Sequence, residues 1–176
     1  MATLLEHGYD AVTDTEIARA AGVHPTTVYR RWGGRPQLVA EVVHRMSGQA
    51  IAPPDEGSLA ADLRVLLREV ADLLQRPEGL AVVRGLAALP AHLEEEIAAT
   101  RRLFWQARFD AAAAIVHRAV ARGELPAGID PHQVLEFLIA PAYLRALLTG
   151  APLDEEFIDA TARRTTRAFG ADSAQP

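Results

Sequence analysis

The chain has no cysteine, no lysine and no long apolar run, and each absence excludes a class of protein or site. Without cysteine there is no disulfide, no thiolate metal site and no cysteine nucleophile. No apolar stretch reaches the roughly 18 residues that span a membrane, and the sequence does not open on a signal-peptide pattern. These features predict a cytoplasmic protein without membrane contact. The formal net charge of −5 argues against a protein that coats nucleic acid over its whole surface.

Arginine supplies all of the strongly basic side chains, and the net charge is distributed unevenly along the chain. Between residues 17 and 40 there are four arginines and no acidic residue, whereas residues 51–176 carry 13 arginines and 18 acidic residues. The front part therefore contains a basic segment, and the back part is acidic. Charge alone does not distinguish a basic binding surface from chance clustering.

The hydrophobic pattern predicts an all-α protein of two domains. No alternating β-branched run and no Asn-Gly or Asp-Gly hairpin signal occurs. Pro53-Pro54 and Gly57 mark a connector, so we expect an N-terminal domain over residues 1–48 and a C-terminal helical domain over residues 58–176. Proline, glycine and capping signals predict helices over residues 2–7, 13–21, 25–31, 35–48, 58–73, 78–89, 92–122, 130–148 and 155–169. The helix after the connector is expected to bury one stripe, formed by Leu59, Leu63, Leu66, Val70 and Leu73.

Two short helices in the front domain are joined by a tight turn. Thr13 and Glu16 fit a capping box at the start of the first, and Gly22 is placed to end it in the left-handed conformation. Pro25 suits the first position of the second helix. This is the plan of a helix-turn-helix, in which the second helix enters the major groove of DNA.

The residues of this segment also follow a known pattern. They read Thr13-x-x-Glu16-Ile17-Ala18-x-x-Ala21-Gly22-Val23-x-x-x-Thr27-Val28-Tyr29-x-x-Trp32-x-x-Arg35-x-x-Leu38, with Gly8-Tyr9 before them. The pattern resembles the tetracycline-repressor (TetR) family of bacterial transcriptional regulators. The resemblance implies a ligand-responsive repressor that binds a palindromic operator as a homodimer. The family's first helix normally starts earlier, so we expect the first helix of this chain to be truncated.

The resemblance also implies which front-domain residues contact double-stranded DNA. Thr13, Thr15 and Arg35 are expected at phosphates. Pro25, Thr26, Thr27 and Arg30 are expected to face bases, and Tyr29 and Arg31 to contact the backbone or base edges. His24, a poor capping residue, is expected to reach DNA instead. The remaining motif positions are expected to pack the two helices together: Ile17, Ala18, Ala21, Val23, Val28, Trp32 and Leu38.

The segment over residues 134–148 is apolar nearly all round, with Glu136 and Arg145 as its only charged residues. It is too short to cross a bilayer, so it must be covered on two sides by protein. The simplest cover is a second copy of the chain, paired through the last two helices in a twofold four-helix interface. The alternative is a fully internal helix of a monomer. Pro141 is expected to kink this helix or to leave a carbonyl free.

The back domain offers side chains for an effector pocket, although ordinary core or dimer packing explains each of them as well. Aromatic rings with a polar end can line an apolar cavity and still offer a hydrogen bond. The candidates are Phe104, Trp105, Arg108, Phe109, His117, Phe137 and Tyr143. The ligand class does not follow from these residues.

Two other functions compete with a regulator. Glu41 and His44 form a Glu-x-x-His pair, which is half of the motif of a di-metal helical-bundle enzyme. No other histidine has a glutamate three residues before it, so we predict no metal site, no cofactor and no catalytic residue. A helical protein-interaction module without DNA binding is the second alternative, and the basic segment argues against it.

Overall fold

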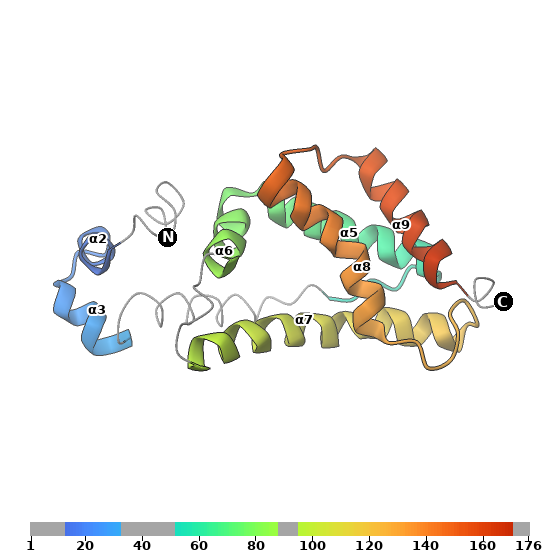
Figure 1. Ribbon diagram of the computed structural model, residues 1–176, viewed down its shortest axis with the longest axis horizontal. Helices are drawn as coiled ribbons and strands as arrows, with labels where there is room; N and C mark the ends of the chain where they lie inside the picture. Colours follow the sequence, from blue (N-terminus) through green and yellow to red (C-terminus); the bar gives the residue numbers. More distant parts are fainter. Residues whose placement is uncertain (1–12, 33–51, 88–94, 171–176) are drawn as a thin grey trace. The chain divides into compact units, whose positions relative to one another are not determined.

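The computed structural model describes residues 13–32, 52–87 and 95–170. Their elements are α2 (Asp14–Ala20), α3 (Pro25–Trp32), α5 (Leu59–Gln75), α6 (Pro77–Ala87), α7 (Glu95–Ala121), α8 (Pro131–Leu144), a π-helical turn η1 (Arg145–Thr149) and α9 (Glu155–Phe169) (Figure 1). These ranges contain no strand, so the all-α prediction is confirmed. None of their helices is long and apolar enough to cross a membrane. The helices predicted over residues 2–7 and 35–48 lie outside the described residues.

By their mutual contacts, the residues divide into two compact units. The first unit comprises residues 1–49 and 76–106, and the second comprises residues 50–75 and 107–176. The division near residue 50 falls within the predicted connector. The first unit also includes residues 76–106, which the sequence pattern had grouped with the back domain.

The helices of the second unit begin where capping residues stand. Asp130 accepts a hydrogen bond from the His132 N–H at 2.9 Å, and Pro131 follows it at the first position of α8. Asp154 accepts one from the Phe157 N–H at 2.9 Å and starts α9. Each aspartate satisfies an N–H group that has no partner within its own helix. The predicted bounds of α9 are confirmed.

The core of the second unit lies where α5, α8 and α9 pack together (Figure 1). Leu63 and Leu67 of α5 and Leu138 of α8 are completely buried. Leu67 and Leu74 are buried although the predicted stripe omitted them, whereas Leu73 is only half-buried. The stripe was too narrow because α5 is covered by two helices, and a helix covered from two directions buries a wider arc than a surface helix does.

Residues 145–148, predicted as the end of an α-helix, form the π turn η1. The α-helix continues through Pro141 to Leu144, and η1 then closes with a hydrogen bond from the Gly150 N–H to the Arg145 carbonyl at 2.9 Å. Gly150 has a φ of 67°, a conformation that costs glycine little. The change of helix type therefore comes one turn after the proline.

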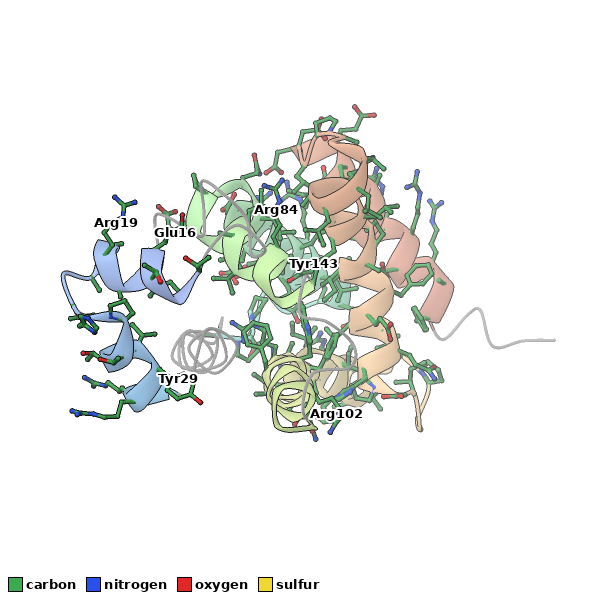
Figure 2. The ribbon with its side chains drawn as sticks, turned by 60° about the vertical axis from the view of Figure 1, so that its left-hand side comes forward. Glu16, Arg19, Tyr29, Arg84, Arg102 and Tyr143 are labelled. Atoms are coloured by element: carbon green, nitrogen blue, oxygen red, sulfur yellow. The ribbon has the colours of Figure 1, made fainter. Side chains whose placement is uncertain are left out.

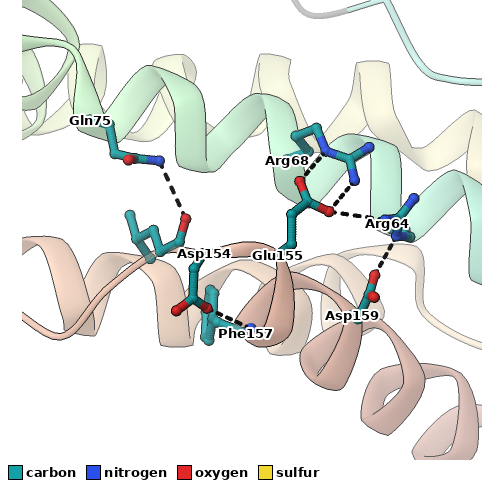
Figure 3. A network of polar contacts seen from close by, with 8 residues as sticks. Arg64, Arg68, Gln75, Asp154, Glu155, Phe157 and Asp159 are labelled. Atoms are coloured by element: carbon teal, nitrogen blue, oxygen red, sulfur yellow. Dashed lines mark hydrogen bonds and ion pairs between the residues drawn. The ribbon is translucent and has the colours of Figure 1, made fainter.

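A network of ion pairs joins α5 to the start of α9 (Figure 3). Arg68 Nε donates to Glu155 at 2.8 Å, and Arg64 donates to both Glu155, at 2.9 Å, and Asp159. The hydrogen bond from Arg68 is the largest cause of the lowered pKa of Glu155. Because these side chains are partly exposed, water and salt screen their attraction, and the network orients α9 more than it stabilises the fold.

Candidate nucleic-acid interface

The start of α2 is closed by the predicted capping box. The Glu16 N–H donates to Thr13 Oγ1 at 3.2 Å, and the Thr13 N–H donates to Glu16 Oε2 at 2.9 Å. The Thr13 hydroxyl also donates to the same carboxylate oxygen at 3.2 Å. Both Thr13 and Thr15 are exposed.

The turn between α2 and α3 is built on Gly22, as predicted. Gly22 has a φ of 67°, and the N–H groups of Gly22 and Val23 donate back to the carbonyls of Arg19 at 3.2 Å and Ala18 at 2.9 Å. This pair of bonds is the Schellman arrangement, in which a left-handed residue satisfies the last carbonyls of a helix. It fixes the direction in which the chain enters α3.

The two helices are held together by small, fully covered side chains. Ala18 is 0% exposed and Val28 is 1% exposed, which agrees with their predicted packing role. The same prediction was wrong for Ala21 and Val23, which are both exposed. These two residues belong to the turn, where the chain leaves the buried face of α2. The Trp32 side chain and Leu38 lie outside what the structure describes.

His24 precedes Pro25 at the start of α3 and makes only a long capping contact. Its Nδ1 accepts a long hydrogen bond of 3.4 Å from the Thr26 N–H and lies 3.0 Å from the Thr26 hydroxyl. One ring nitrogen is therefore occupied on the helix that begins at Pro25. The imidazole is nevertheless exposed, so DNA contact by its outer edge stays a prediction.

The face of α3 opposite the buried Val28 is accessible to a partner. At 100° per residue, Thr26 and Arg30 lie opposite Val28, with Thr27 and Tyr29 on either side, and all four are exposed. Tyr29 is 68% exposed and projects from the helix (Figure 2). Such a ring offers apolar area together with a hydroxyl, and threonine and arginine supply hydrogen-bond donors.

The electrostatic character of this surface is basic. Between Ile17 and Trp32 the chain carries Arg19, Arg30 and Arg31 and no acidic residue, and all three arginines are exposed. An α-helix fits the major groove of B-DNA, where arginine forks can meet guanine or phosphate. The geometry of α2 and α3 therefore matches the docking of a helix-turn-helix. Arg35 lies outside the described residues.

Comparison with known proteins identifies the family. The family described as "Bacterial regulatory proteins, tetR family" matches residues 1–42, and the family described as "Tetracyclin repressor-like, C-terminal domain" matches residues 53–165. The chain belongs to the TetR family. It is a DNA-binding transcriptional regulator rather than an enzyme, and the matches favour neither of the two competing functions.

Individual relatives agree with this assignment. The HTH-type transcriptional regulator AqdR of Rhodococcus erythropolis is 33% identical over 135 residues, which cover 77% of this chain and 64% of AqdR. The DNA-binding transcriptional repressor TetR of Mycobacteroides abscessus is 31% identical over 160 residues, which cover 88% of this chain and 81% of that protein. The chain thus spans slightly less than two thirds of AqdR and a larger share of the second relative.

Solved structures of other proteins share the fold. The TetR-family regulator SCO0332 matches with a TM-score of 0.68 and 25% identity, covering 99% of this chain and 93% of that one. GusR of Salmonella enterica matches with a TM-score of 0.74 and 16% identity, covering 96% of this chain and 90% of GusR. At that identity, the likeness to GusR shows the fold alone.

The seven predicted effector-pocket residues are divided between the two units. Phe104 and Trp105 belong to the first unit, where their rings meet edge to face at 5.3 Å. The other five belong to the second unit. Among them, His117 is exposed, and Phe137 is 49% exposed. The rings of Phe137 and Phe169 are in contact, with centroids 5.4 Å apart. Phe109 stacks on His132.

Arg108 and Tyr143 are the two candidates that the structure places within electrostatic range of each other. Burial lowers the pKa of Arg108, and burial raises the pKa of Tyr143 to about 12 although the guanidinium opposes that rise. At neutral pH the phenol is therefore protonated and the guanidinium is charged. Both side chains are half-buried, and both carry hydrogen-bond donors.

A polar cluster near the connector was not predicted from the sequence; it is formed by Asp62 of α5, Arg118 of α7, and Arg122 and Glu124, which follow α7. Asp62 is completely buried. One signal was available: Asp62 stands between Leu59, Leu63 and Leu66 on the apolar side of α5, and a carboxylate there needs a partner.

Proposed function

We propose that this protein represses transcription as a homodimer that binds a palindromic operator, with α3 of each copy in the major groove of one half-site. The exposed basic face of α3 carries this proposal, because it joins an aromatic ring, two threonines and an arginine fork on one side of a helix that is held by packing on its other side. The two half-sites would lie about one DNA turn, roughly 34 Å, apart or somewhat farther.

The individual roles follow from position and chemistry. Thr26, Thr27 and Arg30, with Pro25, face the bases, and Tyr29 and Arg31 contact base edges or backbone. Thr13 and Thr15 at the start of α2, together with His24 and Arg35, contact phosphates or the groove edge. A regulator of this kind works in the cytoplasm on chromosomal DNA, and needs neither a metal nor a cofactor for these contacts.

The proposed dimer forms through α8, η1 and α9. Phe137, Leu144 and Leu148 are 49%, 51% and 79% exposed, and they recur along one side of α8 and η1. Leaving three large apolar side chains in water is unfavourable, and a second copy of the same surface would bury all of them. Phe169 of α9 packs against Phe137 and so extends this surface.

The proposed effector is a small molecule that binds the second unit beside Arg108 and Tyr143. It can act only if it binds the form that holds DNA and the form that releases it with different affinities. A compound library screened by melting temperature, with wild type and Tyr143→Phe in parallel, tests the site. Compounds that stabilise only the wild type support it, and hits that stabilise both variants equally contradict it.

Selection of binding sites from random duplex DNA tests the main proposal. We expect a palindromic consensus, because two identical α3 helices related by a twofold axis read two copies of one half-site. A non-palindromic consensus would contradict the dimeric arrangement. A complete lack of enrichment would contradict sequence-specific binding.

A further inference from the structure

One side of α8 and η1 carries a row of uncharged side chains that are exposed in the single chain. The row consists of Gln133, Phe137, Ala140, Leu144 and Leu148, and we call it the α8 stripe. Its first four positions are separated by four, three and four residues. This is the spacing with which a helix presents one continuous seam to a neighbouring helix.

The π turn η1 extends the stripe by one turn. Heptad spacing places the next exposed position at residue 147, but Leu147 is half-buried and Leu148 is 79% exposed. In η1 the Gly150 N–H donates to the Arg145 carbonyl, five residues earlier, so this turn contains one residue more than an α-helical turn. The additional residue moves the exposed position from 147 to 148.

The remaining sides of α8 are occupied within the second unit. Arg145 is directed toward the segment that leads into α9, because its guanidinium lies over the Phe157 ring, 4.0 Å from the centroid, and donates to the Pro152 carbonyl. The buried residues of α8 lie on the side opposite the stripe: Val134, Leu135, Leu138 and Ala142. The stripe is therefore the face of α8 that is left for a partner.

The stripe is symmetric about Ala140, which has its smallest side chain. Phe137 and Leu144 lie one turn to either side, and Gln133 and Leu148 lie two turns to either side. A small central residue lets two helices approach closely, while the larger side chains beside it fill the space between them. A twofold interface requires that residue i meets residue j and that j meets i in return. An inverted second copy is the occupant that matches this symmetry.

We propose that the α8 helices of two copies pack antiparallel along this stripe, with the twofold axis passing Ala140. This inference rests on the proposed homodimer and adds its register. Phe137 then packs against the partner's Leu144, and Gln133 lies beside the partner's Leu148. The π turn thereby acquires a role, because it brings Leu148 rather than residue 147 onto the seam.

The absence of cysteine from the sequence makes disulfide cross-linking a direct test. Packed helices have axes about 8–10 Å apart, which places two facing Cα atoms about 4–6 Å from each other, within reach of a disulfide. Ala140→Cys should therefore form a covalent dimer under mild oxidation. Gln133→Cys is the matched control on the same stripe, because its two copies would lie about four turns, roughly 22 Å, apart.

A double variant that combines Gln133→Cys with Leu148→Cys tests the register at the ends of the stripe. It should cross-link between chains although neither single variant does, because position 133 faces the partner's position 148. Within one chain these two positions are about four turns apart, too far for a disulfide. Melting temperature, and sedimentation before oxidation, establish that each variant is folded and dimeric.

At micromolar protein we expect Ala140→Cys to cross-link at least about 100-fold faster than Gln133→Cys, because facing thiols have a roughly millimolar effective concentration. If the chain sediments as a dimer but the two variants cross-link equally fast, the inference is wrong while the proposed function stands. The same holds if the double variant does not cross-link. If the wild type sediments as a monomer and binds only a single half-site, the proposed dimeric function fails and the inference fails with it.

Discussion

At the scale of single residues, substitutions of Tyr29 test DNA recognition most directly. It is 68% exposed on α3, so its removal does not leave a cavity. We expect Tyr29→Ala to lower operator affinity by about 100-fold and Thr27→Ala by about 10-fold, because one good base or backbone contact contributes about 1–3 kcal/mol. Electrophoretic mobility shift or anisotropy titration measures both.

Tyr29→Phe is the matched control, since it keeps the ring and removes only the hydroxyl. Melting temperature and sedimentation of all three variants should equal those of the wild type. A loss of dimer in Tyr29→Ala or Thr27→Ala, or unchanged operator affinity, would contradict the assignment of these residues to the DNA surface.

A second prediction at this scale concerns the carboxylate of Glu69. Its Oε2 is buried and has no hydrogen-bond partner among the described residues. Burial raises the pKa of Glu69, and Asp72 raises it further. We expect Glu69→Met, a substitution of similar size, to increase the free energy of unfolding at pH 7 by about 1 kcal/mol, because burying an unpaired polar group costs this order of energy.

The stabilisation of the fold by Glu69→Met should depend on pH. Since the folded-state pKa of Glu69 lies above the ordinary value of 4.5, protonation favours the folded wild type as pH falls through that raised pKa. The advantage of Glu69→Met should therefore shrink with falling pH and disappear below about pH 4.5. Urea titrations at several pH values measure it, and a pH-independent difference would contradict this account of Glu69.

At the scale of elements, local signals predicted most of the helices. The signals were Thr13 with Glu16, Gly22, Pro25 and Asp130. Each acts on backbone groups within a few residues, so its effect can be predicted from the sequence. The π turn after Leu144 and the broad buried arc of α5 were not predictable in this way. Both depend on neighbours that are distant in sequence, and a period of 3.6 residues carries no information about them.

The cap of α9 gives a prediction at this scale. Removing the Asp154 side chain leaves the Phe157 N–H without its partner and weakens the favourable interaction with the helix dipole. We expect Asp154→Ala to lower the free energy of unfolding by about 1 kcal/mol. Asp154→Asn, which can still accept the hydrogen bond, should cost clearly less in thermal or urea unfolding. Equal costs for the two variants would show that the cap contributes little.

At the scale of the whole molecule, features formed within one segment of the chain were predictable from the sequence. Features formed by residues that are distant in sequence were not. The α2–α3 motif occupies one continuous segment, so its helices and turn followed from local signals, and its expected DNA contacts came from the resemblance to the TetR family. The polar cluster near the connector joins Asp62 to Arg122, 60 positions later in the sequence, and no local pattern relates them.

The dimer surface supplies the prediction for the assembly. Leu148 is 79% exposed in η1, on the side of the helix that also carries Phe137 and Leu144. We expect Leu148→Glu to give monomers in analytical ultracentrifugation, because an unpaired charge buried in an apolar interface is strongly unfavourable. Ala127→Glu, at an exposed loop position of the same unit, should remain dimeric. An unchanged dimer in Leu148→Glu would mean that another surface joins the two copies.

The central claim is that this TetR-family chain reads DNA sequence through the basic face of α3. The most direct test is its affinity for the selected operator and for a shuffled duplex, measured over a range of salt concentrations. We predict that the operator binds at least about 1,000-fold more tightly, and that its affinity falls steeply with salt, with a log–log slope of about −0.9 per phosphate neutralised. Equal affinity for the two duplexes, or an affinity independent of salt, would contradict the claim.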